Sequence, residues 1–173
     1  FNRSHSVSYA INAYETAYLK CHYKAFFWAA NLTQNMKKKD KFRKFLRSAR
    51  DMGLKVKSVD VDKSGVGVTA SFNAGDAECD TIVFGFDTAT GVNETVAHEI
   101  VAARRANGGS FKSFDDFMTH GPESILSTAA VAGLANAGAF DCLGVTRKQV
   151  ADRAAWIVDF YRTKRKAVSS ANT

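Results

Sequence analysis

Apolar residues recur at helical spacing through the first part of the chain. Residues 8–34 contain no glycine or proline, and small or aromatic side chains return every three or four positions. These residues are Ala10, Ala13, Tyr14, Ala17, Tyr18 and Cys21. The pattern predicts one or two largely buried helices.

The next segment combines an apolar stripe with many cations. Phe42, Phe45, Leu46, Ala49 and Met52 follow the spacing of one helix face. The other faces carry eight cations between residues 37 and 50, with Asp40 as the only acid: Lys37, Lys38, Lys39, Lys41, Arg43, Lys44, Arg47 and Arg50. This predicts an amphipathic basic helix that ends at Gly53.

Strand-like and helical patterns alternate in the rest of the chain. The β-branched and aromatic stretches 54–61, 66–72 and 80–86 predict three short strands. Helices are expected over 94–107, from a Ser113 cap that Asp116 reaches back to, from Pro122 to about residue 137, and from Arg147 onward. The expected fold is therefore mainly α with a small β-sheet, an α+β class.

Charge is distributed unevenly along the 173 residues, a length that suits one domain or two small ones. The net charge is +10 over residues 1–58, −8 over 59–145 and +5 over 146–173. A polyanion would be attracted to the two ends and would meet the middle only through neutral or backbone groups. We therefore interpret the basic helix as a nucleic-acid contact rather than a merely solvated face.

Several kinds of site are disfavoured by the sequence. Cys21, Cys79 and Cys142 are odd in number and far apart, so they fit neither a zinc site nor a disulfide framework, and a reducing compartment suits them. The histidines have no metal-binding spacing, and no hydrolase or nucleotide-binding fingerprint occurs. No apolar run is long enough to cross a bilayer, so no membrane partner is expected.

The segment FDTATGVNETVAHEIVAARR has the outline of a helix-hairpin-helix. Gly91 would allow a sharp turn, so that the amides of Val92, Asn93 and their neighbours meet a phosphate. An ordinary turn in the protein core explains this segment equally well. A second candidate, LANAGAFDCLG, is more simply read as a packing corner that Phe140 fills.

Five blocks in order resemble bacterial DNA polymerase III alpha subunits. The opening FNRSHSVSYAINAYETAYLKCHY is similar to that family's FNKSHSxAYxxxxYxTxxLKxHYP. The stretches DMGLKVKSVDVDKSG, IVFGF, GVNETVAHEIVAARRANGGSFKSFDDF and LANAGAFDCLG resemble further family blocks. The resemblance covers roughly residues 1–150 and marks the chain as a piece of a longer protein.

The resemblance implies an arrangement of domains and sites. Residues 1–52 would be the C-terminal part of a fingers domain, 53–145 a helix-hairpin-helix DNA-binding region with short strands, and 146–173 a C-terminal helix with a frayed tail. The nucleotide-binding residues would be Asn2, Arg3, Ser4, His5 and Tyr9. The expected DNA contacts are Lys37, Lys38, Lys41, Lys44, Arg47, Gly91, Val92, Asn93 and Thr95.

The sequence also departs from the family pattern. Asn93 stands where a hairpin glycine is usual, and Ser127, Thr128 and Ala129 replace an Asn-Lys-Arg run, which puts DNA contact by the second hairpin in doubt. The family's metal-binding aspartates lie upstream, in a palm domain. We therefore expect no catalytic residue, metal ligand or cofactor in this chain, and Mg²⁺ in the absent palm.

The expected function is that of a replicative polymerase segment that binds primer-template DNA and helps to form the incoming-nucleotide site. On its own the segment would be inactive. Its partners would be DNA, a deoxynucleoside triphosphate, the rest of the alpha subunit and, through regions outside this chain, a sliding clamp. The location would be the cytoplasm of a bacterium or a phage-infected cell. The alternatives are a free-standing, non-catalytic DNA-binding accessory protein and, less well matched, a helix-hairpin-helix glycosylase.

Overall fold

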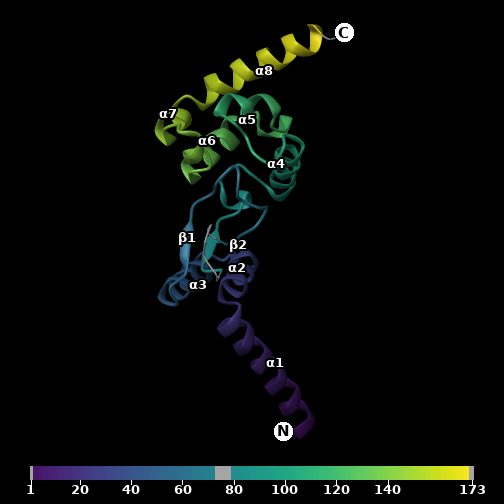
Figure 1. Cartoon of the computed structure of the whole chain (residues 1–173), viewed down its shortest axis with the longest axis vertical. Helices are drawn as coiled ribbons and strands as arrows, with labels where there is room; N and C mark the ends of the chain where they lie inside the picture. The colour runs from purple at the N-terminus through teal and green to yellow at the C-terminus, as the bar shows by residue number, and fades with distance from the viewer. Residues whose placement is uncertain (1, 73–78, 172–173) are drawn as a thin grey trace. The chain divides into compact units, whose positions relative to one another are not determined.

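The chain forms two compact units that are both discontinuous in sequence. The computed structural model describes residues 2–72 and 79–171 (Figure 1). One unit, here the N-terminal unit, contains Phe1–Val56 and Thr69–Ile82, and the C-terminal unit contains Lys57–Val68 and Val83–Thr173. The polypeptide thus passes between the units three times, after residues 56, 68 and 82.

Three helices begin the N-terminal unit: α1 (Arg3–His22), α2 (Lys24–Asn35) and α3 (Lys39–Asp51). Helices α2 and α3 bury their facing sides, because Trp28 lies edge-on to Phe45, with 5.9 Å between the ring centroids. The indole nitrogen of Trp28 also donates to the sulfur of Met52 at 3.2 Å. Leu32 and Ala49 are fully buried in the same contact.

Helix α1 is not buried, and the expectation of a largely buried helix is wrong for this part of the chain. No described residue of α1 is buried, and its apolar side chains Val7, Ile11, Tyr14 and Tyr18 are 45–70% exposed. The sequence period identifies the helix correctly. It cannot say whether the partner for the apolar side chains lies in the same chain.

The predicted small sheet is present. Strands β1 (Lys55–Lys57), β2 (Thr69–Ser71) and β3 (Thr81–Val83) form one sheet in the order β1-β3-β2. The amide of Lys55 donates to the carbonyl of Asp80 at 2.9 Å, and their side chains form an ion pair at 2.8 Å. Each strand is shorter than the apolar stretch that predicts it, because only three residues of each stretch pair with a neighbouring strand.

The C-terminal unit is helical (teal to yellow in Figure 1). Its core contains the phenylalanines Phe86, Phe117 and Phe140, and the rings of the last two lie 5.1 Å apart. The elements in order are η1 (Phe86–Thr88), α4 (Glu94–Ala106), α5 (Phe114–His120), η2 (Glu123–Ile125), α6 (Thr128–Ala137), η3 (Asp141–Leu143), α7 (Arg147–Asp152) and α8 (Ala154–Ala171). The mainly α fold with a small sheet is confirmed.

Local signals explain where these helices begin and end. Ser113 caps α5 by accepting the amide of Asp116 at 3.1 Å, as expected, but the Asp116 carboxylate accepts from Lys112 rather than from Ser113. The segment after Pro122 starts as a 3₁₀ turn, and α6 begins only after the Ser127 cap. Helix α8 continues to Ala171, through most of the tail that was expected to fray. Among the described residues, no helix is both long and apolar enough to cross a membrane.

Candidate nucleic-acid interface

The turn between η1 and α4 fits closely against helix α6. Gly91 has a φ of +81°, and a Cβ added there would lie 2.7 Å from the backbone carbon and oxygen of Ala129. A Cβ on Gly133 would lie 1.7 Å from the carbonyl oxygen of Thr90. Glycine is therefore required at both positions, because only a residue without a Cβ lets the backbone of the turn approach the backbone of α6 this closely.

The amides left available at the turn differ from those expected. The amide of Val92 donates to the carbonyl of Ala89 at 3.2 Å, and the Val92 side chain is buried, so this residue serves the turn itself. The amide of Val96 donates to the Asn93 side chain at 2.9 Å. The first amides of α4, at Glu94 and Thr95, have no partner within a helix. Together with the Asn93 amide they lie at the positive end of α4, where an anion is favoured.

Asn93 is suited to its position even though the family pattern has glycine there. Its φ is −93°, so the backbone needs no glycine. Its side chain instead caps α4, an arrangement that contributes about 1 kcal/mol to helix stability. The substitution therefore preserves the turn.

Acidic side chains surround the same turn. Glu94 occupies the first turn of α4, and Asp87 lies on η1 with its Oδ1 atom buried and without a hydrogen-bond partner. Burial raises the pKa of Asp87, and the neighbouring charge of Glu94 raises it further. The hairpin thus offers backbone dipoles to a phosphate but little favourable side-chain charge.

The basic segment in the N-terminal unit has the opposite character. Lys41, Lys44 and Arg47 are exposed on α3, whereas Lys37 and Lys38 precede the helix. The helix starts at Lys39, two residues later than predicted, and cations at a helix N-terminus are disfavoured by the macrodipole. Its other side is half-buried through Phe42, Phe45 and Leu46, and the cations are left on the exposed side.

The five predicted nucleotide-binding residues lie on the exposed first turns of α1. Asn2 caps the helix by accepting the amide of Ser4 at 3.4 Å. The rings of His5 and Tyr9 meet edge-on, with 4.5 Å between their centroids. In a helix with 3.6 residues per turn, His5 and Tyr9 share a face, whereas Arg3 and Ser4 lie on other sides. The structure therefore brings together two of the five.

The second hairpin has the features of a packing corner. Gly138 has a φ of +87°, and Phe140 is buried in the core. Arg147 closes the corner through a bidentate pair with Asp141, whose Nε–Oδ1 distance is 2.9 Å. The residues at the start of α6 carry no cation: Ser127, Thr128 and Ala129.

Sequence reasoning missed a loop that fixes residues 60–64 to the helices of the C-terminal unit. The buried hydroxyl of Ser64 accepts the amide of Asp60 at 2.9 Å and donates to the carbonyl of Phe84 at 2.6 Å. The guanidinium of Arg104 on α4 donates to the carbonyls of Val61 and Ser64 at 3.0 and 2.8 Å. The fully buried serine has no periodic signal, so only the resemblance of this block could have identified it.

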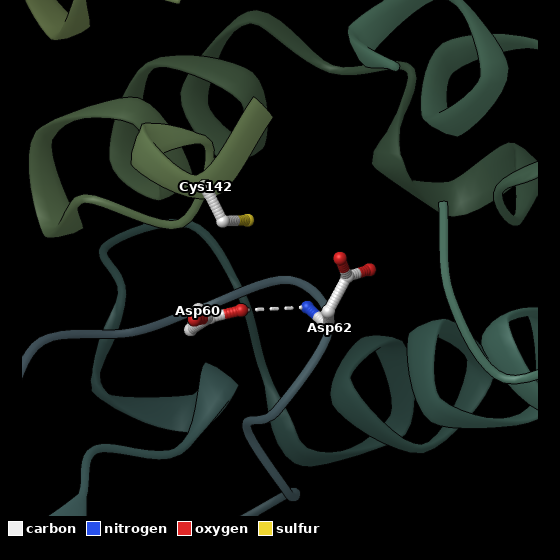
Figure 2. A group of neighbouring side chains, drawn as sticks. All are labelled: Asp60, Asp62 and Cys142. Carbon is white, nitrogen blue, oxygen red and sulfur yellow. Dashed lines mark hydrogen bonds between the residues drawn. The ribbon is translucent and has the colours of Figure 1, made fainter. Parts of the chain in front are cut away.

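Asp60, Asp62 and Cys142 converge in the same loop region (Figure 2). One potential ligand atom from each lies within 4.8 Å of the others. However, Oδ1 of Asp60 accepts the Asp62 amide at 2.9 Å, and Oδ1 of Asp62 accepts the Phe111 amide at 2.9 Å. The carboxylates thus already shape the loop.

The group does not fit a Mg²⁺ ion. Burial raises the pKa of the Cys142 thiol to about 11, with the two aspartates adding to the effect. The thiol is therefore protonated at neutral pH, whereas Mg²⁺ takes oxygen ligands in near-octahedral geometry. We assign these three residues to the structure of the loop.

Comparisons with known proteins identify relatives of both units. A helix-hairpin-helix motif model matches residues 53–150. The DNA polymerase III alpha subunit of Thermus aquaticus is 37% identical over 144 residues, which are 83% of this chain and 11% of that protein. Those of Saccharopolyspora erythraea and Aquifex aeolicus are 38% and 36% identical over 92% and 87% of this chain. The chain spans 11–13% of the length of these relatives.

Proposed function

Because the chain belongs to the helix-hairpin-helix family and is similar to one segment of DNA polymerase III alpha subunits, we propose that it holds primer-template DNA for a replicative polymerase. The observation that carries this proposal is the contact of Gly91 with α6. It fixes the turn that leads into α4, where Asn93, Glu94 and Thr95 are exposed at the helix N-terminus. Backbone amides in this arrangement bind phosphate without reading the bases. Such binding suits a polymerase, which must hold any sequence.

Helix α3 would add a second, charge-based contact. Its exposed cations Lys41, Lys44 and Arg47, with Lys37 and Lys38 just before it, match a phosphate backbone and repel one another when it is absent. This contact attracts DNA over a distance, whereas the hairpin amides act only at short range.

Helix α1 would serve two partners through opposite sides. Asn2, His5 and Tyr9 offer an amide, an imidazole and a phenol to an incoming deoxynucleoside triphosphate. The apolar stripe of Val7, Ile11, Tyr14 and Tyr18 lies on the other side of the helix. We assign this stripe to the remainder of the alpha subunit, since it is exposed here and the relatives are far longer than this chain.

Catalysis would depend on that remainder. Phosphoryl transfer requires carboxylates that hold metal ions, and the acidic group at Asp60 and Asp62 does not fit that role. The purified chain is therefore expected to show no primer extension with Mg²⁺ and deoxynucleotides. Template-directed incorporation by the pure chain would contradict this assignment.

Fluorescence anisotropy with labelled primer-template DNA tests the DNA-binding proposal. We expect several unrelated sequences to bind equally well, and affinity to fall about tenfold or more between 50 and 200 mM salt. A strong preference for one sequence, or an affinity that does not change with salt, would overturn the proposal.

A further inference from the structure

Helix α8, which lies beyond the family match, contributes three cations to a pocket. The pocket has a volume of about 580 Å³ and is lined by Glu123, Leu126, Arg162, Arg165 and Lys166. The three cations lie at i, i+3 and i+4 on one side of α8, which packs against α5 and α6. The family model ends at residue 150, so this pocket combines residues inside and outside the matched region.

Both arginines are held in place by backbone carbonyls. Arg162 donates through Nη2 to the carbonyl of Leu126 at 2.6 Å. Arg165 donates through Nε to the carbonyl of Met118 at 3.0 Å, and its Nη2 donates to the same oxygen. A guanidinium has five N–H donors in a planar fork, so each arginine keeps further donors while its position is fixed. A preorganised fork loses little entropy when an anion binds.

The pocket has an excess of positive charge. Among the described residues that line it, Glu123 is the only acid, against three cations. Burial lowers the pKa of Arg165, and Glu123 offsets this only in part, so the guanidinium has lost some of its hydration. An anion in the pocket would restore favourable interactions to this partly desolvated cation.

The pocket also adjoins the candidate interface. Leu126, which accepts from Arg162, immediately precedes the Ser127 cap of α6. The Gly91 turn contacts the same helix at Ala129. The first turn of α6 therefore links the hairpin with the pocket, and α8 supplies cations where α6 itself has none.

We infer that Arg162, Arg165 and Lys166 bind a phosphate group of the DNA backbone beside the hairpin. This inference rests on the proposed DNA-binding function and adds a phosphate contact outside the matched helix-hairpin-helix region. The phosphate oxygens accept from the free N–H groups of the two guanidiniums, and Lys166 contributes a third charge at the rim.

The test compares Lys166→Glu with Lys148→Glu, an exposed lysine on α7 in the same unit. The two variants change the net charge equally, and among the described residues neither lysine side chain forms a hydrogen bond or an ion pair. We expect Lys166→Glu to weaken binding of primer-template DNA about three- to tenfold more than Lys148→Glu at 100 mM salt. Arg162→Gln should also weaken binding, with circular dichroism confirming that the variant is folded.

A second measurement separates the pocket from DNA binding in general. Inorganic phosphate is titrated against the ¹⁵N-labelled chain, and the amide signals of residues 162–166 should shift in the parent and not in Lys166→Glu. If the parent binds DNA but both glutamate variants lose equal affinity, the pocket assignment is wrong and the proposed function stands. If the parent binds no DNA while phosphate still shifts these signals, the proposed function fails, and so does the assignment of the pocket to DNA. If phosphate shifts no signal in residues 162–166, the pocket does not bind phosphate.

Discussion

Helix α3 and the Gly91 hairpin are two candidate DNA contacts that depend on different physics. On α3 the contact consists of flexible, exposed cations, and the helix scaffold only keeps them on one side. At the hairpin the candidate contact consists of backbone amides beside a turn that two glycines pack closely against α6, among acidic side chains. DNA binding through α3 should tolerate substitutions and weaken as the salt concentration rises. DNA binding through the hairpin should tolerate almost no added atom at the two glycines and should depend less on salt.

The largest effect is expected at the crossing of α6 with the turn. Replacing glycine by alanine inside a helix usually stabilises it by about 1 kcal/mol. In Gly133→Ala the new methyl group would overlap the carbonyl oxygen of Thr90, so we expect destabilisation by about 3 kcal/mol or more. Chemical denaturation measures this, with Asn136→Ala on the exposed side of α6 as the control. A Gly133→Ala variant as stable as the parent would show that the crossing is loose.

The next effect separates backbone strain from the close contact. Gly91 and Gly108 have nearly the same φ, +81° and +82°, but a Cβ at Gly108 meets nothing within 4 Å. Alanine at Gly108 should therefore cost only the strain of a left-handed backbone, about 1–2 kcal/mol. Alanine at Gly91 should cost roughly 1–3 kcal/mol more, from the contact with Ala129. Equal losses of stability in the two variants would contradict the close approach.

DNA binding by these variants sharpens the comparison further. Where Gly91→Ala remains folded, its affinity should fall at every salt concentration with little change in the salt dependence. Amide contacts depend on geometry, and the number of cations is unchanged.

Charge removal on α3 should produce the complementary result. In the double variant Lys44→Gln/Arg47→Gln we expect unchanged stability and a slope of log affinity against log salt that is smaller by about 2. The control replaces Lys112 and Lys148, two exposed lysines of the C-terminal unit, by glutamine. A slope equally reduced in the control would mean that charge acts through the whole chain rather than through α3.

The smallest effect concerns Asp87 beside the turn. Burial raises the pKa of this carboxyl in the folded state above its unfolded value. The protonated form is thus favoured by folding, and this contribution is present below the unfolded pKa and lost as pH rises through the folded pKa. Asp87→Asn should raise the melting temperature at pH 7 and leave it nearly unchanged at pH 3. An increase of the same size at both pH values would exclude ionisation as the cause.

The helices and turns of this fold could be predicted from the sequence more fully than the contacts between them. Periodicity located α1, α3 and α4, and Gly91 marked a turn, because these signals act over a few neighbouring residues. Contacts between distant residues gave weaker signals. A glycine inside a helix, such as Gly133 in α6, lowers helix propensity and can mark a close approach, but nothing in the neighbouring sequence indicates that Thr90 is the residue it contacts.

The candidate site shows the same limit. The resemblance supplied the candidate residues, yet it could not show that the Val92 amide is used within the turn, or that Arg3 and Ser4 lie apart from His5. To predict which amide is bonded or which side of a helix a residue occupies, the start of each helix must be known to within one residue. The role of Arg104 as a clamp on residues 61 and 64 depends on a separation of about forty residues and was missed for that reason.

The three passages of the chain between its two units affect how the gene can be divided. A cut after residue 56 would separate β1 from β3, its neighbour in the sheet, and a cut after residue 82 would remove the Ser64 loop from Arg104. No single cut within residues 57–82 leaves both units intact, because each unit has residues on both sides of such a cut. Recombination between relatives should therefore be tolerated more often outside residues 55–84 than within them, so that the three strands and the loop of residues 60–64 are inherited as one block.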